Sequence, residues 1–160
     1  MSKQRKVTVI GAGPMGLAIT GVFLKNGYEV TAWNRTKEKL QTLKDQGVKI
    51  VSDLNEAVSN SPIIVVCVLN YEIVSKLFQN LERELLGKVV VNFTNGTPEQ
   101  ANNAAKYFVA KGAKYVDGGI MAIPPTIGTP HSFILYSGDT SAFNEHKELL
   151  EKLGVDSGPC

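Results

Sequence analysis

The stretch VTVIGAGPMG, residues 7–16, predicts how this chain folds. Its first four residues are rich in Val and Ile, which is typical of a buried strand, and the apolar segment 17–25 that follows is typical of a helix packed on a sheet. Between them lies the spacing Gly-x-Gly-x-x-Gly, the pattern of a strand-to-helix turn that holds a pyrophosphate. The stretch therefore predicts the first unit of a dinucleotide-binding fold.

Each residue of this turn has a role in the prediction. Gly11 allows a tight turn out of the strand, Gly13 has no Cβ and lets the backbone approach a phosphate, and Gly16 lets the helix pack close to the strand. Pro14 starts the helix without losing an N–H, and the free N–H groups of the first turn, Met15 included, face the phosphates. The alternative is a glycine-rich turn that binds nothing.

The end of the second expected strand, residues 28–33, indicates which dinucleotide is bound. NAD-binding domains usually place an acid there, where it accepts hydrogen bonds from the adenosine ribose. This chain has Asn34, Arg35 and Thr36 instead. Asn34 and Thr36 can donate to phosphate oxygens, and Arg35 can pair with a 2′-phosphate or stack on adenine, with Lys39 one helical turn beyond. The segment predicts NADP(H); the alternative is a basic, solvated start of a helix.

The rest of the chain alternates short apolar runs with helical patterns. This alternation predicts a single α/β domain over residues 1–160, a doubly wound, mostly parallel sheet of the Rossmann type. We expect further strands at residues 48–51, 63–69, 89–92, 114–117 and 133–136. We expect helices that begin at Thr36, Asp53, Asn70 and Thr97, and a last helix over residues 140–153. Residues 155–160 are expected to form no regular structure.

In an open α/β sheet, ligands lie beyond the carboxyl ends of the strands. The residues that follow the fourth and fifth strands are Leu69 and Asn70, and Thr94 and Asn95. We expect all four to contact the cofactor; turn and helix-cap chemistry is the alternative for each. Asp117, at the end of the sixth strand, is either a functional acid or a turn former.

Composition excludes several other classes of function. A net charge of +2 gives no argument for nucleic acid, and the longest apolar run, residues 63–69, is too short to cross a membrane. Cys67 and Cys160 do not suggest a disulfide framework, so we expect a reducing cytoplasm. No metal-ligand spacing is present, and His131 and His146 are expected to be structural.

With these motifs in place, the chain resembles the N-terminal NADP-binding domain of the β-hydroxyacid dehydrogenase and 6-phosphogluconate dehydrogenase superfamily, and within it the imine reductases. The segments that carry the resemblance are residues 9–16, 30–36, 91–98, 117–125, and 128–130 leading into 134–138. Asn34-Arg35-Thr36 matches the family's 2′-phosphate clamp. Hydroxyacid dehydrogenases carry a Ser-Gly-Gly substrate motif after the sixth strand, and here residues 120–124 replace it, which favours imine chemistry.

The resemblance implies an oxidoreductase that transfers hydride from NADPH to a C=N bond of a small imine or carbonyl substrate, held near Met121 and Pro124. A β-hydroxyacid or semialdehyde dehydrogenase, and a non-catalytic NADP-binding module, remain as alternatives. Family members continue into a helical domain, which carries the proton donor and is exchanged between the subunits of a homodimer. The resemblance thus implies that this chain is a fragment or a truncated product that binds cofactor without turnover.

Overall fold

The computed structural model describes residues 5–81 and 83–159. Within this part of the chain, eight strands form one sheet in the order β3-β2-β1-β4-β5-β6-β7-β8. All neighbouring strands are parallel except β6 and β7, which are antiparallel. Their bounds are β1 (Lys6–Ile10), β2 (Glu29–Trp33), β3 (Lys49–Ile50), β4 (Ile63–Val66), β5 (Val89–Asn92), β6 (Lys114–Met121), β7 (Phe133–Gly138) and β8 (Val155–Pro159).

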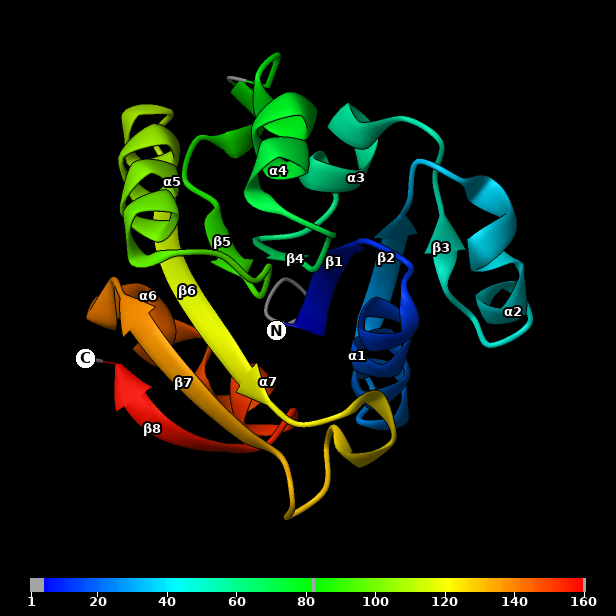
Figure 1. Cartoon of the computed structure of the whole chain (residues 1–160). Helices are drawn as coiled ribbons and strands as arrows, with labels where there is room; N and C mark the ends of the chain where they lie inside the picture. The colour runs from blue at the N-terminus through cyan, green and yellow to red at the C-terminus, as the bar shows by residue number, and fades with distance from the viewer. Residues whose placement is uncertain (1–4, 82, 160) are drawn as a thin grey trace.

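Helices cover both faces of this sheet, which confirms the doubly wound α/β class. Figure 1 shows α3, α4 and α5 gathered on one side, with α1 apart from them. The helices and 3-10 turns are α1 (Pro14–Lys25), η2 (Lys37–Leu40), α2 (Gln41–Lys44), α3 (Leu54–Ser59), α4 (Tyr71–Phe78), η3 (Arg83–Leu85), α5 (Pro98–Ala110), η4 (Pro124–Thr126), α6 (Thr140–Glu145) and α7 (Lys147–Glu151).

Side chains that alternate along the strands build two cores, one on each face of the sheet. Ile63 and Val65 of β4 join the core that includes α1, α6 and α7, whereas Ile64 and Val66 join the core that includes α3, α4 and α5. All four side chains are fully buried. The unbroken apolar run of β4 therefore reflects a central strand that is covered on both faces.

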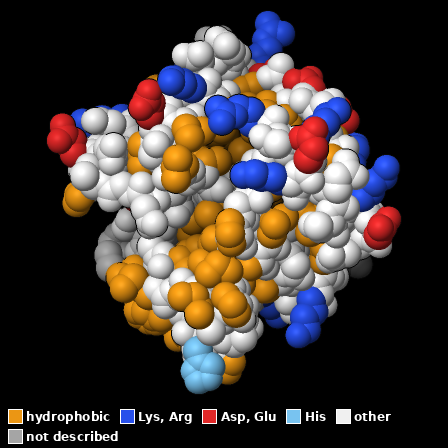
Figure 2. All heavy atoms as spheres, turned by 45° about the vertical axis from the view of Figure 1, so that its right-hand side comes forward, with side chains coloured by type: hydrophobic (Ala, Val, Ile, Leu, Met, Phe, Trp, Pro, Cys, Tyr) orange, Lys and Arg blue, Asp and Glu red, His pale blue; other side chains and the backbone are white. Residues whose placement is uncertain are grey.

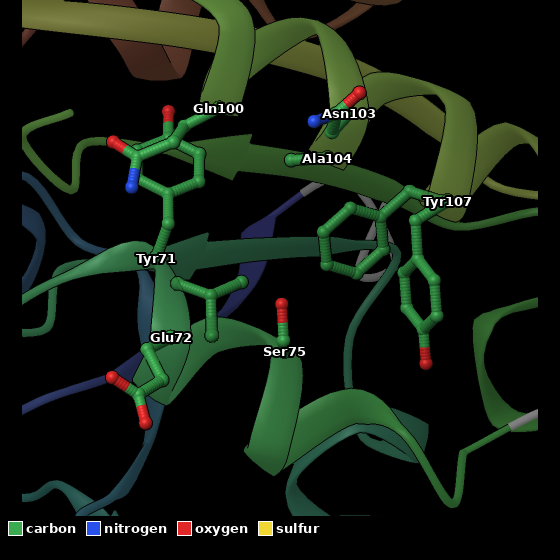
Figure 3. A pocket seen from close by; sticks show the side chains of 9 residues that line it. Tyr71, Glu72, Ser75, Gln100, Asn103, Ala104 and Tyr107 are labelled. Atoms are coloured by element: carbon green, nitrogen blue, oxygen red, sulfur yellow. The ribbon is translucent and has the colours of Figure 1, made fainter. Parts of the chain in front are cut away.

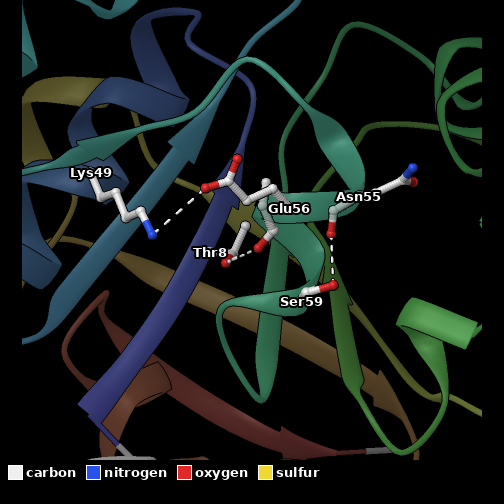
Figure 4. Close-up of polar contacts among 6 residues, drawn as sticks. Thr8, Lys49, Asn55, Glu56 and Ser59 are labelled. Atoms are coloured by element: carbon white, nitrogen blue, oxygen red, sulfur yellow. Dashed lines mark hydrogen bonds and ion pairs between the residues drawn. The ribbon is translucent and has the colours of Figure 1, made fainter.

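Polar groups fasten α3 to the sheet. The buried Thr8 of β1 donates from Oγ1 to the carbonyl oxygen of Ala57, at 2.7 Å, and Lys49 of β3 lies 3.8 Å from the Glu56 carboxylate (Figure 4). Ser59 donates from Oγ to the Asn55 carbonyl oxygen at 2.8 Å within the helix. The Thr8 bond satisfies a hydroxyl that would otherwise be costly to bury.

Most helix starts were predictable from local chemistry. The side chains of Asp53 and Asn70 accept the expected hydrogen bonds, and Thr97 forms a complete capping box with Gln100. Thr36 occupies the residue before η2, but its side chain makes no capping bond, so that prediction is wrong in its mechanism. The segment begins as a 3-10 turn and continues into the single turn of α2.

Two strands have different lengths from those expected. β4 ends at Val66, not at residue 69, because the Val68 N–H bonds to the Thr94 side chain (3.2 Å) instead of to a neighbouring strand. β6 continues to Met121, four residues beyond the expected end at Asp117, because β7 pairs antiparallel with it from Val116 to Met121. The expected long loop after residue 117 is thus partly strand.

The C-terminal region differs most from expectation. The last helix is broken at His146, where the backbone has φ −114° and ψ 19°, and forms α6 and α7. Residues 155–159 form β8, which pairs parallel to β7 and whose first residue, Val155, donates to the Ser132 carbonyl oxygen at 2.9 Å. The expectation that this segment is irregular is wrong because its partner strand, not its composition, organises it. Cys160 lies outside the described residues.

His146 makes stability depend on pH. Burial lowers its pKa; the charge of Glu145 opposes this shift and that of Lys114 adds to it. The unfolded chain therefore takes up the proton near pH 6.5, before the folded chain does, so the free energy of unfolding falls as the pH drops from about 6.5 through the lower folded-state pKa. Denaturant unfolding at several pH values between about 7 and 5 should show a flatter dependence for His146→Gln. His131→Gln, which removes an exposed imidazole, is the matched control, and an unchanged slope in His146→Gln would contradict the prediction.

Candidate dinucleotide-binding site

The sheet reverses its strand order beside β1, between the branch that runs to β3 and the branch that starts with β4. Residues 11–16 leave the carboxyl end of β1 at this point and enter α1, whose first residue is Pro14. Such a reversal is where open α/β sheets bind ligands. Gly13 is the residue before the helix, so the free N–H groups of the first turn lie at the expected place.

Backbone contacts require glycine at two of the three motif positions. Gly11 has φ +116°, and a Cβ there would collide with the Cys67 carbonyl oxygen. A Cβ on Gly16 would collide with the Gly11 carbonyl oxygen. At these contacts the backbones that follow β1 and β4 and that enter α1 touch with no side chain between them.

Gly13 is different, because a Cβ built on it meets no atom within 4 Å and its φ of −70° suits any residue. Packing therefore does not explain a glycine here. The open space above Gly13 is what a phosphate group would occupy if the backbone is to approach it closely. The residues present thus fit the pyrophosphate of a dinucleotide.

Asn34 connects the phosphate loop to the segment that follows β2. Its Oδ1 accepts from the Ala12 N–H at 3.1 Å, and its Nδ2 donates to the Thr36 carbonyl oxygen at 2.9 Å. The Gly11 N–H also bonds to the Trp33 carbonyl oxygen at 3.0 Å. The amide that was expected to donate to a phosphate is therefore also a brace between the two segments, and a second Nδ2–H is available for a ligand.

The charged side chains of the segment after β2 are open to solvent. Arg35, Thr36 and Lys39 are all exposed, and Lys37 adds a third cation beside the single acid Glu38. An exposed cationic cluster next to the phosphate loop can meet an anionic group without first breaking a buried ion pair. Contact of these residues with a 2′-phosphate remains a prediction.

The residues after β4 have separate environments. Leu69 is 81% exposed, which is unusual for a large apolar side chain beside a candidate ligand site. Asn70 uses its Oδ1 to cap α4 through the Ile73 N–H, at 3.0 Å. The expectation that Asn70 caps a helix is confirmed. Contact of Leu69 or Asn70 with a cofactor remains a prediction.

Thr94 and Asn95 follow β5, and only Asn95 is exposed. Thr94 is buried: its Oγ1 accepts from the Val68 N–H at 3.2 Å, and its N–H donates to Asn92 Oδ1 at 3.0 Å. Thr94 thus joins the loop after β4 to the loop after β5. Sequence reasoning placed it at the site but missed this link, which depends on a polar residue at the buried end of β5.

Asp117 lies within β6 and is not a turn former. Both of its carboxylate oxygens accept from the Tyr71 hydroxyl, at 3.2 and 3.3 Å. Burial raises the pKa of Asp117, against hydrogen bonds from Tyr71 and the Gly118 backbone that lower it. Burial, with the charge of Asp117, raises the pKa of Tyr71 to about 12, so its proton stays on the phenol at neutral pH.

The two residues expected on the substrate side lie at the far end of β6. Met121 is the last residue of that strand and is 61% exposed, and Pro124 begins η4. The loop that carries η4 packs on α1, where a Cβ on Gly128 would come within 2.7 Å of Val22 Cγ2. Gly128 therefore lies beside the last turn of α1, and η4 contacts the same helix, whereas these contacts do not place Met121 there.

Two hollows of the structure are lined by residues other than 11–16 and 34–39. One, of about 430 Å³, lies between α4 and α5 and is lined by Tyr71, Ser75, Gln100, Asn103 and Tyr107 among others (Figure 3). The other, of about 520 Å³, includes Lys6 and Glu29 at the amino ends of β1 and β2. In the described part of the chain, three or more metal-binding side chains do not come together. Among the same residues, no helix has the length and apolarity to cross a membrane.

Comparisons with known proteins agree with this geometry. The family model of the NAD binding domain of 6-phosphogluconate dehydrogenase matches residues 6–158. The NADPH-dependent reductive aminase of Aspergillus oryzae is 39% identical over 165 residues, which cover 99% of this chain and 55% of that protein.

Two solved structures have the same fold. The imine reductase from Myxococcus stipitatus, in complex with NADP⁺, is 40% identical and superimposes with a TM-score of 0.93, over 97% of this chain and 54% of that one. The imine reductase from Bacillus cereus, at 39% identity, has a TM-score of 0.93 over the same shares of the two chains. The present chain thus spans about half the length of these relatives. It belongs to the family of the NAD binding domain of 6-phosphogluconate dehydrogenase.

Proposed function

We propose that this chain binds NADP(H) and forms the cofactor-binding half of an enzyme that reduces C=N bonds. The observation that supports the proposal is Gly13: it precedes α1 at the switch point of the sheet, and the space where its Cβ would lie is free of protein atoms, which leaves room for a phosphate at the first turn of the helix. The exposed Arg35 and Lys39 beside it supply the positive charge that a 2′-phosphate requires.

The chemistry divides between cofactor and protein. The reduced nicotinamide supplies the hydride. Residues 11–16 hold the pyrophosphate by backbone N–H groups, and Asn34 keeps the 2′-phosphate segment in register with them. Thr94 keeps the loops after β4 and β5 together where the nicotinamide half would lie. Met121 and Pro124 offer apolar surface to a small imine or carbonyl substrate.

An exposed apolar surface supports association with a further domain. Hydrophobic side chains gather over one face of the molecule (Figure 2). In β7, Ile134 and Tyr136 are buried while the alternate residues Phe133 and Leu135 are 40% and 46% exposed. We propose that the remaining half of the enzyme, from a partner subunit of a homodimer, covers this face and brings the proton donor.

Two other functions remain open to experiment. A β-hydroxyacid or semialdehyde dehydrogenase would need polar groups after β6 to hold a carboxylate, and residues 120–124 are apolar except for the backbone. A non-catalytic NADP-binding module would keep the phosphate loop and Arg35 and lack turnover in any assembly. We favour imine reduction because of the identity to reductive aminases and imine reductases.

Gly13→Ala separates binding from folding. A methyl group at Gly13 meets no protein atom, so the melting temperature should be unchanged, but it enters the space proposed for the pyrophosphate. We expect NADPH affinity to fall by at least about tenfold, measured by calorimetric titration. Gly21→Ala, inside α1, also meets no atom within 4 Å and should leave affinity unaltered. Equal affinity in the Gly13 and Gly21 variants would argue against a phosphate site.

Arg35→Ala tests the choice of dinucleotide. Loss of charge-assisted hydrogen bonds worth about 1.5–3 kcal/mol should weaken NADPH binding by roughly ten- to a hundredfold and leave the weaker NADH binding almost unchanged. Lys37→Ala removes a neighbouring exposed cation and is the matched control. If both variants lose the same affinity at fixed ionic strength, the effect is general charge and not recognition of the 2′-phosphate.

The 160-residue chain itself should bind NADPH and turn over little or no imine. The proton donor and part of the substrate pocket are proposed to lie in a further domain, which these residues do not include. Fluorescence titration should show stoichiometric NADPH binding, while NADPH oxidation with a cyclic imine should stay at the rate without protein. Robust turnover by the purified chain would contradict the proposal that the proton donor lies outside these 160 residues.

A further inference from the structure

A series of buried and partly buried polar contacts links β6 and α4 to the loops after β4 and β5. It begins at Asp117, which accepts from the Tyr71 hydroxyl. Burial raises the pKa of Tyr115, the neighbouring Asp117 and Tyr71 add to that shift, and Tyr115 Oη accepts from Asn92 Nδ2 at 3.1 Å. Asn92 Oδ1 accepts from the Thr94 N–H, and Thr94 Oγ1 accepts from the Val68 N–H in the loop after β4.

The donors and acceptors of this series point in one direction. Asn92 has used its Oδ1 on the backbone of Thr94, so its Nδ2 is the group left for Tyr115, whose own hydroxyl proton is then free for Tyr71. The Tyr71 proton goes to the carboxylate. Asp117 therefore orients the Tyr71 hydroxyl, and Asn92 orients the backbone of the loop after β5 through Thr94.

Burial makes these links costly to lose. The exposed fractions are 0% for Asn92, 3% for Tyr115 and 7% for Tyr71. Leaving a polar group unpaired at such a position costs free energy, so removing one hydroxyl disturbs the groups that it contacts. Asn92 is the last residue of β5, so a change in its partners acts on the loop that follows.

Tyr71 also supports this loop through its ring. A Cβ built on Gly96 would lie 2.5 Å from both Cδ2 and Cε2 of Tyr71, so the ring packs directly on the loop backbone. Figure 3 shows the Tyr71 ring beside Gln100, the residue that completes the cap of α5 at Thr97. The loop between β5 and α5 is thus held by Tyr71 from the helix side and through Asn92 from the sheet side.

We propose that Tyr71, anchored on Asp117, is a positioning residue that holds the loops at residues 67–70 and 93–97 in the shape that receives the nicotinamide half of NADP(H). The inference rests on the proposed function. The brace from Asn34 to Ala12, which serves the adenosine half, shares no hydrogen bond with this series. The two halves of the cofactor should therefore respond differently to a change at Tyr71.

Two ligands distinguish the halves in a titration of the 160-residue chain. Adenosine 2′,5′-bisphosphate presents only the adenosine side, whereas NADPH presents both. For Tyr71→Phe we expect NADPH affinity to fall by roughly tenfold, because the loops lose their fixed shape, and the bisphosphate affinity to stay within about twofold. An equal loss for both ligands, as a merely structural defect would give, overturns the inference.

Matched variants complete the experiment. Tyr107→Phe removes another hydroxyl of the same layer, which donates to the Phe78 carbonyl oxygen at 2.7 Å and takes no part in the series; both affinities should be retained. Asp117→Asn keeps one acceptor for the Tyr71 hydroxyl, so we expect a smaller loss of NADPH affinity and no loss of bisphosphate affinity. This variant tests the positioning role if Tyr71→Phe does not fold. If the parent binds no NADPH, the proposed function fails; if the parent binds and Tyr71→Phe and Asp117→Asn bind equally well, only the positioning role fails.

Discussion

The site depends on a pair of close contacts between backbones: Gly11 lies against the Cys67 carbonyl oxygen, and Gly16 lies against the Gly11 carbonyl oxygen. No side chain fits at either glycine, so β1, α1 and the end of β4 meet at a distance that any other residue would increase. These contacts set where the first turn of α1 begins relative to the carboxyl ends of the strands. A ligand bound by the N–H groups of that turn is therefore placed against the loops after β4 and β5 without any side chain needing to adjust.

Asn34 adds a second constraint. Its side chain holds two backbone segments together and carries no negative charge beside the proposed 2′-phosphate. Its amide accepts from Ala12 and donates to Thr36, a pair of bonds that needs both an acceptor and a donor on one short side chain. An aspartate would keep the first bond, lose the second and place a negative charge where a 2′-phosphate is expected. The segment that lacks the usual acid is thus held in shape by Asn34, the residue that stands in the acid's place.

Much of the fold and part of the site could be predicted from the sequence, and the division follows the range of the interactions. The capping box at Thr97, the cap at Asn70 and the glycine turn are local, because their partners lie within a few residues. The strand at residues 155–159 and the extension of β6 arise from pairing with β7, which local composition does not reveal. The link from Tyr71 to Asp117 joins residues 46 apart and was missed for the same reason.

The two halves of the sheet differ in how completely the described residues cover them. From β2 to β5 the strands carry buried residues on both faces, and this region needs only its own helices. β7 runs antiparallel to β6 and parallel to β8, and the residues of β7 from Phe133 to Tyr136 are alternately exposed and buried. Met121 and Phe133, which pair across β6 and β7, both stay exposed. Because Met121 is also a candidate substrate contact, a domain that covers this face would close the substrate pocket in the same step, so assembly and completion of the site would be one event.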